Sequence, residues 1–301
     1  MFKKSEEDFV ENINERRRIR SQFVVADKII KTAKSGRKYI DVRLSDKTGE
    51  IVGRMFPEEG VEVTFEPINP GKIHRVLGNV NEYPQGSGRF NIIVNVIKEL
   101  SEEEYDIDDF IRTSDKDKDQ LINEVETTIK EIENKDLKKL LDAFFSDEKF
   151  AEEFYNAPSA KVYHHNYVGG LLEHTAEVLR ICKTTCEIFP ELDKDLLYTG
   201  AILHDVGKLE TYDYDLVRIE FSEEGKLLDH LFISCDMVKD KIREIEMPKE
   251  LATQLLHIIL SHHGDVKNGW GSPVSPKTPE AVALHHADNL DAKVKGMLQK
   301  M

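Results

Sequence analysis

The sequence has few cysteines and no long apolar stretch, and each shortage excludes a class of protein. The 301 residues include three cysteines, an odd number without a C-x-x-C pair, so neither a disulfide framework nor a zinc knuckle is indicated. Apolar runs such as residues 92–94 and 258–260 are far below the roughly 18–20 residues of a transmembrane helix. No apolar run follows the basic residues at the start, as a secretory signal would require. We therefore expect a cytoplasmic protein without a membrane partner.

The composition indicates a folded chain whose two parts differ in charge. Apolar residues make up 40% and charged residues 33%, which does not fit disordered or low-complexity proteins. The length is enough for about two domains. The net charge of −15 argues against a protein that coats nucleic acid through a general positive field. The charge is uneven, however, because residues 1–100 carry 18 basic and 15 acidic side chains and the remainder carries 24 and 42.

Residues from about 21 to 100 have the pattern of short strands. Ile40, Val42 and Leu44 alternate with more polar residues, and residues 46–49 have turn character before a second strand-like segment at residues 51–56, which predicts a hairpin. Further strands are predicted at residues 61–65, 73–80 and 89–97. About five strands in so short a segment are typical of a small barrel.

Residues 42–51 resemble the second and third strands of OB-fold nucleic-acid-binding domains, in which a similar apolar pattern leads through aspartate and Thr-Gly to isoleucine. The resemblance implies a five-stranded OB-fold barrel at residues 1–100 that binds a strand through a basic groove and aromatic platforms. Each aromatic residue could instead fill the barrel core. The candidates are Tyr39, Phe56 and Tyr83 for stacking, with Arg37, Lys38, Arg43, Arg54 and Arg75 for phosphates. Of these, Tyr39, Arg43, Arg54 and Phe56 are our substrate-binding candidates, although related barrels often have tryptophan in place of Phe56.

The apolar period becomes helical from about residue 119, where residues at three- and four-residue steps are apolar. Residues 278–280 place a capping threonine, a proline and an acid together, as at a helix start. Acidic residues are concentrated between residues 101 and 136, which is typical of a solvated linker. We therefore predict a multidomain α and β protein, with an acidic linker and leading helices at residues 101–160 and an all-α bundle at residues 161–301.

Ten of the eleven histidines lie between residues 163 and 286, several beside acids or glycines in apolar segments. Imidazole and carboxylate groups together suit a borderline divalent cation, and ligands from separate helices can meet inside a bundle. The adjacent pair His204 and Asp205 is the strongest single indication of a metal site. Adjacent helical residues point about 100° apart, so both can bind one ion only if it lies between their directions. Lys208, one turn beyond His204, could reach a phosphate bound at that ion.

This order of residues resembles the HD-domain metal-dependent phosphohydrolases, whose ligands are a histidine, an adjacent His-Asp pair, two further histidines and a distant aspartate. The resemblance implies metal ligands at His174, His204, Asp205, His230, His262 and Asp288. It also implies that Asp205 is shared by two ions. With Lys208 placed to reach a bound phosphate, Asp205 and Lys208 are our catalytic candidates. His164, His165 and His263 are candidates for substrate contact, with a surface cap for the first two and a metal-supporting role for His263 as alternatives. His285 and Asp291 lie one turn either side of Asp288 and could orient it.

Over nearly its full length the chain resembles the YhaM-type 3′→5′ exoribonucleases, which join an OB-fold, a helical linker and an HD domain. Similar segments are residues 164–171, 196–205, 260–264, 270–273 and 288–293. The resemblance implies hydrolysis of single-stranded RNA to nucleoside monophosphates, with DNA open as a further substrate. Histidine-rich ligands favour Mn²⁺, Fe²⁺ or Co²⁺ over Mg²⁺, and we expect two Mn²⁺ ions. The sequence indicates no oligomeric state.

Two other functions stay open. One is an HD-class phosphodiesterase that acts on a mononucleotide or a cyclic dinucleotide. Enzymes of the HD-GYP type follow their paired histidines with glutamate and then Gly-Tyr-Pro, whereas this chain has Gly264 and then Gly-Ser-Pro at residues 271–273. The other is a non-catalytic RNA-binding module with a relict metal site.

Overall fold

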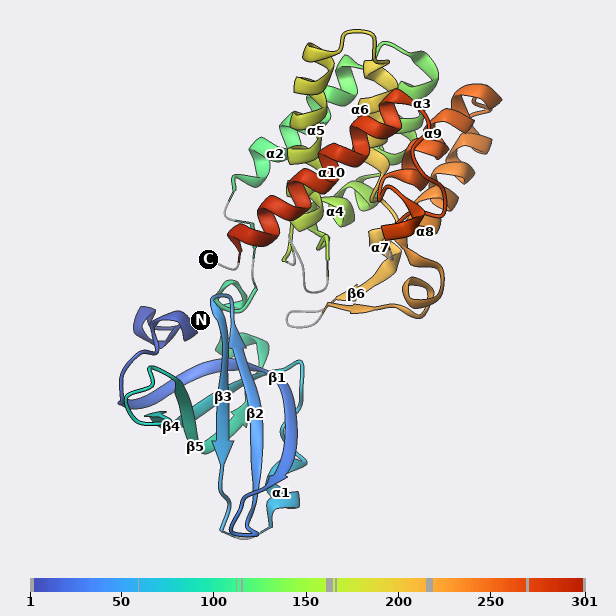
Figure 1. Cartoon of the computed structure of the whole chain (residues 1–301). Helices are drawn as coiled ribbons and strands as arrows, with labels where there is room; N and C mark the ends of the chain where they lie inside the picture. The colour runs from blue at the N-terminus through green and yellow to red at the C-terminus, as the bar shows by residue number, and fades with distance from the viewer. Residues whose placement is uncertain are drawn as a thin grey trace. The chain divides into compact units, whose positions relative to one another are not determined.

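The computed structural model describes residues 3–58, 60–111, 113–114, 116–160, 165, 167–214, 219–268 and 271–299. The chain forms two compact units, shown in Figure 1. The first comprises Met1–Arg112 with Tyr214–Arg218, and the second comprises Thr113–Asp213 with Ile219–Met301.

The first unit is a closed barrel of five strands in the order β1-β2-β3-β5-β4. Neighbouring strands are antiparallel except for β3 and β5, which are parallel. The predicted hairpin is confirmed, since Asp46 pairs with Gly49 across the turn and the alternating residues Ile40, Val42 and Leu44 are fully buried in the barrel core. The strands are β1 (Arg18–Thr32), β2 (Lys38–Asp46), β3 (Gly49–Met55), β4 (Ile73–Glu82) and β5 (Phe90–Glu99).

The strand predicted at residues 61–65 is wrong, because this segment forms the short helix α1 (Val61–Phe65). The fifth strand is instead β1, whose first half pairs with β4 and whose second half pairs with β2. Because β1 pairs with both β2 and β4, the five strands close the barrel without residues 61–65. Val61 and Phe65, four residues apart, lie on one side of α1 and pack against the barrel core.

Short 3₁₀ turns flank the barrel strands at Glu6–Asp8, Val10–Asn12, Glu102–Glu104 and Ile107–Asp109. The segment before the first turn inserts Lys4 into the barrel, where its Nζ lies 2.5 Å from Oδ2 of Asp46 and over the ring of Phe23. The barrel therefore has a buried ion pair as well as an apolar core.

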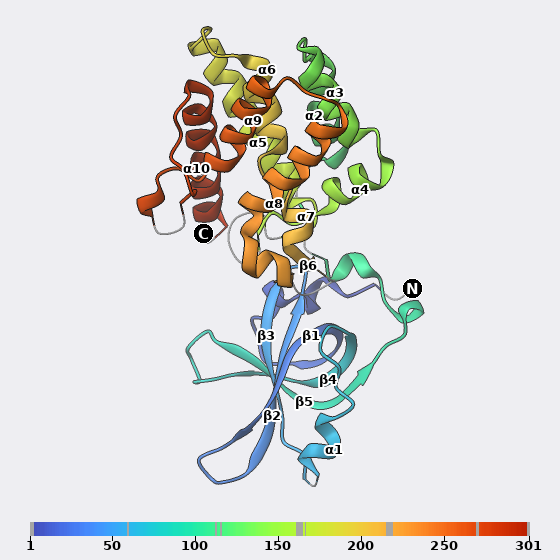
Figure 2. The ribbon, with the colours of Figure 1, turned by 90° about the vertical axis from the view of Figure 1, so that its right-hand side faces the viewer.

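The second unit is helical, as predicted, and most of its buried apolar residues form one cluster. Figure 2 shows α6 among the helices against which it packs, including α5, α9 and α10. The predicted helix start is confirmed, since the Thr278 side chain accepts from the Ala281 amide and Pro279 opens the helix. The helices are α2 (Lys118–Glu131), α3 (Lys135–Phe145), α4 (Glu148–Asn156), α5 (Gly170–Ile188), α6 (Lys194–Leu203), α7 (Lys208–Thr211), α8 (Glu223–Glu244), α9 (Lys249–Ser261) and α10 (Pro279–Leu298), with a 3₁₀ turn at Val266–Asn268.

Two short strands interrupt this helical unit, β6 (Tyr212–Tyr214) and β7 (Ile219–Phe221), which pair between α7 and α8. They are an addition to the predicted bundle. The three cysteines are free thiols. Within the part of the chain that the structure describes, no helix combines the length and the apolar character needed to cross a membrane.

Candidate metal centre and nucleic-acid face

Six side chains that the resemblance assigns to metal binding meet inside the helical unit. They come from five helices or the residues that follow them: His174 from α5, His204 and Asp205 after α6, His230 from α8, His262 after α9 and Asp288 from α10. All six are at most 8% exposed. The helices pack against one another through their apolar faces, and this packing brings the six donor groups together in the interior.

The first group of donors surrounds Oδ2 of Asp205. Nε2 of His174 lies 3.2 Å from Nε2 of His204, 3.4 Å from Oδ2 of Asp205 and 3.2 Å from Oδ1 of Asp288. Nε2 of His204 is 3.3 Å from the same Asp205 oxygen. Two ligands that each lie about 2.1 Å from one cation are roughly 3 Å or slightly more apart. These separations therefore match a shared divalent ion.

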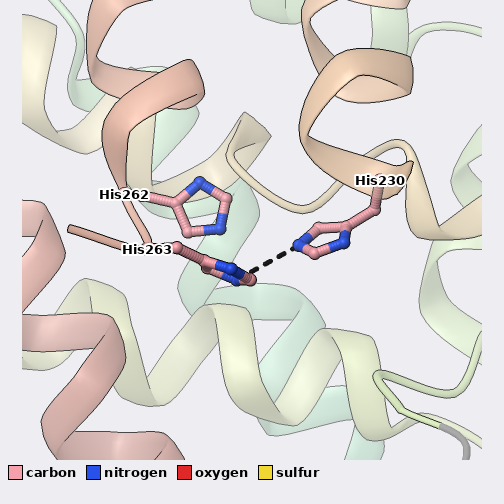
Figure 3. Close-up of side chains that lie close together, drawn as sticks. All are labelled: His230, His262 and His263. Atoms are coloured by element: carbon pink, nitrogen blue, oxygen red, sulfur yellow. Dashed lines mark hydrogen bonds between the residues drawn. The ribbon is translucent and has the colours of Figure 1, made fainter. Parts of the chain in front are cut away.

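The second group surrounds Oδ1 of Asp205 and contains three imidazoles, drawn in Figure 3. Nε2 of His230 is 3.5 Å from Oδ1 of Asp205, and Nε2 of His262 is 3.6 Å from it. His263 reaches the same place, with its Nε2 3.2 Å from Nε2 of His230. Sequence reasoning left His263 between substrate contact and metal support. The structure adds it to this group because α9 ends at Ser261, so that two successive histidines turn toward His230.

Two atoms in this centre have no hydrogen-bond partner among the described residues, although both are buried. They are Oδ1 of Asp205 and Nε2 of His262. A buried carboxylate oxygen without a partner is costly, and a cation between these atoms would satisfy both. Nitrogen and carboxylate donors together also suit a divalent transition metal. The residues present thus fit such an ion.

Each of the four ligand histidines has its Nδ1 engaged by an acceptor. Nδ1 of His204 donates to the carbonyl of Ala201 at 2.8 Å, and Nδ1 of His262 donates to that of Ile259 at 2.7 Å. The other two histidines use carboxylates: His174 lies 2.6 Å from Oδ2 of Asp291, and His230 lies 2.7 Å from Oδ1 of Asp229. Contacts of this kind fix the tautomer and leave Nε2 as the metal-binding atom.

The sequence spacing suggested that Asp291 and His285 orient Asp288. In the structure, both residues contact other groups. The Asp291 carboxylate extends from α10 to His174 on α5, and Nδ1 of His285 donates to the carbonyl of His262 at 2.8 Å. Spacing along α10 shows which residues share a face, but the neighbouring helices decide what that face contacts.

Charge in the centre keeps the carboxylates ionised. Burial raises the pKa of Asp205, but Lys208 and His204 outweigh it and hold this pKa well below its usual range. Burial likewise opposes ionisation of Asp288, yet the hydrogen bond from His174 and the nearby histidines lower its pKa. Burial lowers the pKa of Lys208, whereas Asp205 raises it more strongly. Both aspartates are thus available as anionic ligands.

Lys208 lies against Asp205. Its Nζ is 2.5 Å from Oδ2 of Asp205 and 3.1 Å from Oγ of Ser159, and the residue is 7% exposed. The predicted position one turn beyond His204 thus brings a buried ammonium to the edge of the first donor group.

His165 is fully buried, which excludes the surface cap that sequence reasoning left open. Its Nε2 is 2.9 Å from Oε2 of Glu177, and its Nδ1 is 3.8 Å from Oδ2 of Asp291. Around it lie Glu173 and the lysines that pair with these acids, Lys116 and Lys295. His165 is therefore part of a buried charged network beside the first donor group. The candidate His164 lies outside the described residues.

The four nucleic-acid candidates lie on one outward face of the barrel. Tyr39 and Arg43 alternate with buried residues on β2, Arg54 does so on β3, and Phe56 follows β3 directly. The rings of Tyr39 and Phe56 stack on one another with centroids 5.2 Å apart, and Phe56 is 40% exposed. These aromatic side chains are therefore outside the barrel core and available to a base.

The arginines on this face are each balanced by an acid. Arg54 lies 3.5 Å from Asp41, and Arg43 lies 3.7 Å from Glu50. Other predicted phosphate contacts are also engaged: Lys38 with Glu62 and Arg75 with Glu104, and Arg37 with the carbonyls of Phe56 and Pro57. Phosphates would have to compete with these acids, so the face combines stacking with only moderate positive charge.

Comparisons with known proteins agree with both units. Residues 171–293 match the model of the HD domain, and residues 23–100 match that of the OB-fold nucleic acid binding domain. The chain is 34% identical over 267 residues to the 3′-5′ exoribonuclease YhaM of Bacillus subtilis, which covers 88% of this chain and 82% of that protein. The YhaM proteins of Shouchella clausii and Listeria innocua are 35% and 31% identical over 269 and 268 residues, covering 88% of this chain and 80% and 82% of theirs. The chain therefore belongs to the family of YhaM 3′-5′ exoribonucleases, with the OB-fold and HD domains that its sequence predicts.

Proposed function

We propose that this protein is a metal-dependent 3′→5′ exoribonuclease that hydrolyses single-stranded RNA to nucleoside monophosphates. The observation that carries this proposal is the position of Asp205 between two groups of donors. Its Oδ2 faces His174 and His204, and its Oδ1 faces His230 and His262. One carboxylate shared in this way is the arrangement expected for two cations that act on the same phosphodiester.

The residues of the centre would divide two Mn²⁺ ions between them, with Fe²⁺, Co²⁺ and Mg²⁺ as other candidates. The first ion would be held by His174, His204, Asp205 and Asp288, and the second by Asp205 and the three imidazoles of the second group. When bound, the ions generate a nucleophile from water at neutral pH and neutralise negative charge on the phosphoryl oxygens. The mixture of imidazole and carboxylate donors supports manganese over magnesium.

The protein's own groups would orient the substrate and complete the charge balance. Lys208 carries an ammonium within reach of Asp205, and it would donate to a phosphoryl oxygen as negative charge develops there. Four of the imidazoles, those of His174, His204, His230 and His262, keep Nε2 directed at the centre because their Nδ1 atoms are already bonded. These groups are fixed before the substrate arrives, so little reorganisation is needed during the reaction.

The barrel would hold the RNA strand for the acidic helical unit. Tyr39 and Phe56 would stack on bases, and Arg43 and Arg54 would contact phosphates. A strand bound to one unit has a raised effective concentration for the other, because the two are tethered. An RNA substrate is also consistent with a cytoplasmic protein.

The proposal is tested with RNA labelled at its 5′ end, incubated with the full chain and Mn²⁺ or with a chelator. We expect a ladder that shortens from the 3′ end, requires Mn²⁺ and releases nucleoside monophosphates. Asp205→Ala should abolish the ladder and leave RNA binding intact, whereas Asp240→Ala, at an exposed position of α8, should leave it unchanged.

Other outcomes would overturn the proposal. Internal fragments without a ladder would show an endonuclease. Cleavage of a cyclic dinucleotide or a mononucleotide with intact RNA would show the other class of HD phosphodiesterase, and retarded but uncut RNA would show a binding module. A DNA strand of the same sequence in the same assay measures the preference for RNA.

A further inference from the structure

The helix α8 contains one residue whose backbone is not helical. Asp229 has φ 64° and ψ 151°, and the helix kinks there. This combination is adopted almost only by glycine, because a Cβ atom is strained in it. Asp229 directly precedes His230, so the strained residue adjoins the second group of donors. Strain of this kind persists where the surrounding structure or a function requires it.

The Asp229 side chain explains why a residue other than glycine stands at this kink. Its Oδ1 lies 2.7 Å from Nδ1 of His230 and accepts from the amide of Leu231 at 3.1 Å. The side chain is 65% exposed, so it contributes little to packing. Glycine would relieve the backbone strain, but it would remove the acceptor from His230.

Asp229 is also unlike the acceptors that hold the other ligand histidines. His204 and His262 donate to carbonyls in the preceding turns of their own helices, and those carbonyls are fixed by the helix. His174 donates to Asp291, which is 8% exposed. His230 therefore relies on an exposed carboxylate at a kink, where the surrounding packing restrains the ring least.

We propose that Asp229 is a positioning residue for the second cation. Through its bond to His230, it would set the protein's affinity for this cation separately from the affinity for the first cation. The inference rests on the two-cation centre proposed above. The carboxylate keeps the proton of His230 on Nδ1, so that Nε2 stays directed at Oδ1 of Asp205 and at His263. Asp229 contacts His230 and the amide of Leu231, which both belong to α8, so a change at Asp229 should alter the affinity for the first cation much less than that for the second.

The test compares three variants of the full chain by two measurements. One is the binding of Mn²⁺, followed by calorimetry or by the EPR signal of free Mn²⁺, and the other is the melting temperature of the metal-free protein. Asp229→Gly should raise the melting temperature, because it relieves the backbone strain. It should also lower the affinity for the second Mn²⁺ by about 10- to 100-fold. Asp229→Ala should weaken the second Mn²⁺ equally without raising the melting temperature, and Asp229→Asn should weaken it less.

Glu246 provides a matched control, because it also has a positive φ, 56°, and is exposed beyond the end of α8. Glu246→Gly should raise the melting temperature and leave both Mn²⁺ affinities unchanged. A wild-type protein that binds two ions, with variants at Asp229 that bind both as tightly, would overturn the role of Asp229 alone. Equal weakening of both ions would also overturn it. A wild-type protein that binds at most one ion would overturn the two-cation centre itself, and with it this inference.

Discussion

Asp291 accepts a hydrogen bond from Nδ1 of His174 at 2.6 Å, across the contact between α10 and α5. Both side chains are buried. The aspartate is in turn 3.8 Å from His165, which bonds to Glu177. His174 is thus the inner end of a chain of polar contacts that runs through Asp291 and His165 to Glu177, so several residues determine its orientation.

Removing the Asp291 carboxylate should weaken the binding of the first cation. We expect Asp291→Ala to lower the affinity for that Mn²⁺ by about 10- to 100-fold, since partners of ligand histidines contribute that much. Asp291→Asn keeps an acceptor and should have a smaller effect. Mn²⁺ titration by calorimetry measures both, and Asp240→Ala serves as the exposed control. An unchanged first affinity in Asp291→Ala would contradict the assigned role.

Lys208→Met should slow hydrolysis much more than it weakens RNA binding. The ammonium that lies 2.5 Å from Asp205 would stabilise charge that develops during the reaction, and loss of one such group costs about 10²–10³ in kcat. Single-turnover cleavage and RNA binding are measured together, with Lys226→Met, at an exposed position of α8, as the control. A raised KM with unchanged kcat would instead indicate a ground-state phosphate contact.

Phe56→Ala should weaken the binding of single-stranded RNA by the binding free energy that one stacked base contributes. Stacking on an aromatic ring is worth about 1–3 kcal/mol, and Phe56 is exposed and stacked with Tyr39. Fluorescence anisotropy at a fixed salt concentration measures the change. Val96→Ala, at a half-exposed position of β5, should bind as the wild type does. Equal affinity in both variants would remove Phe56 from the binding face.

Lys4 should titrate well below an ordinary lysine. Burial lowers its pKa from 10.5 to about 8, although Asp46 opposes this. The unfolded chain then binds more protons than the folded one between about pH 8 and pH 10.5, so the free energy of unfolding should rise with pH through this window. That gain is lost as the pH falls through 8. The ¹³Cε shift of Lys4 measures the pKa directly, and Lys4→Met should abolish the pH-dependent rise.

Gly207→Ala should destabilise the helical unit and displace His230. A Cβ atom at Gly207 would lie 2.8 Å from the His230 carbonyl oxygen and 2.8 Å from Oγ of Ser234, and would also clash with the Ser234 amide. Separating α7 from α8 should cost about 1–3 kcal/mol. Gly296→Ala, where a Cβ meets nothing within 4 Å, should instead stabilise α10 by roughly 0.5–1 kcal/mol. Chemical denaturation of both variants checks the contrast.

The sequence predicts the two folds because each has a clear period. Ile40, Val42 and Leu44 alternate as barrel strands do, and they are buried as predicted. Val61–Phe65 is misread because its apolar residues fit both a strand and one face of a short helix. Only the long course of β1 around the barrel decides between the two, and that course depends on pairing between distant segments.

The resemblance to HD domains likewise implies six side chains, and the structure brings them together from α5, α8 and α10 and from the residues that follow α6 and α9. The partners of these side chains are harder to predict. His263 joins the second group only because α9 ends at Ser261. Asp229 acts from a kink in α8, and Asp291 acts across two helices. These contacts depend on where helices end and cross, which one-dimensional periodicity does not show.

His204 and His262 are anchored by the carbonyls of Ala201 and Ile259, which every amino acid supplies. Point mutation of those two positions leaves the acceptor atoms in place, so the orientation of these two imidazoles depends on helix geometry and not on which side chains residues 201 and 259 carry. The anchors of His174 and His230 are instead the side chains of Asp291 and Asp229, so a substitution at either aspartate removes or changes the acceptor. Libraries randomised at these two codons are the direct route to variants with altered metal preference.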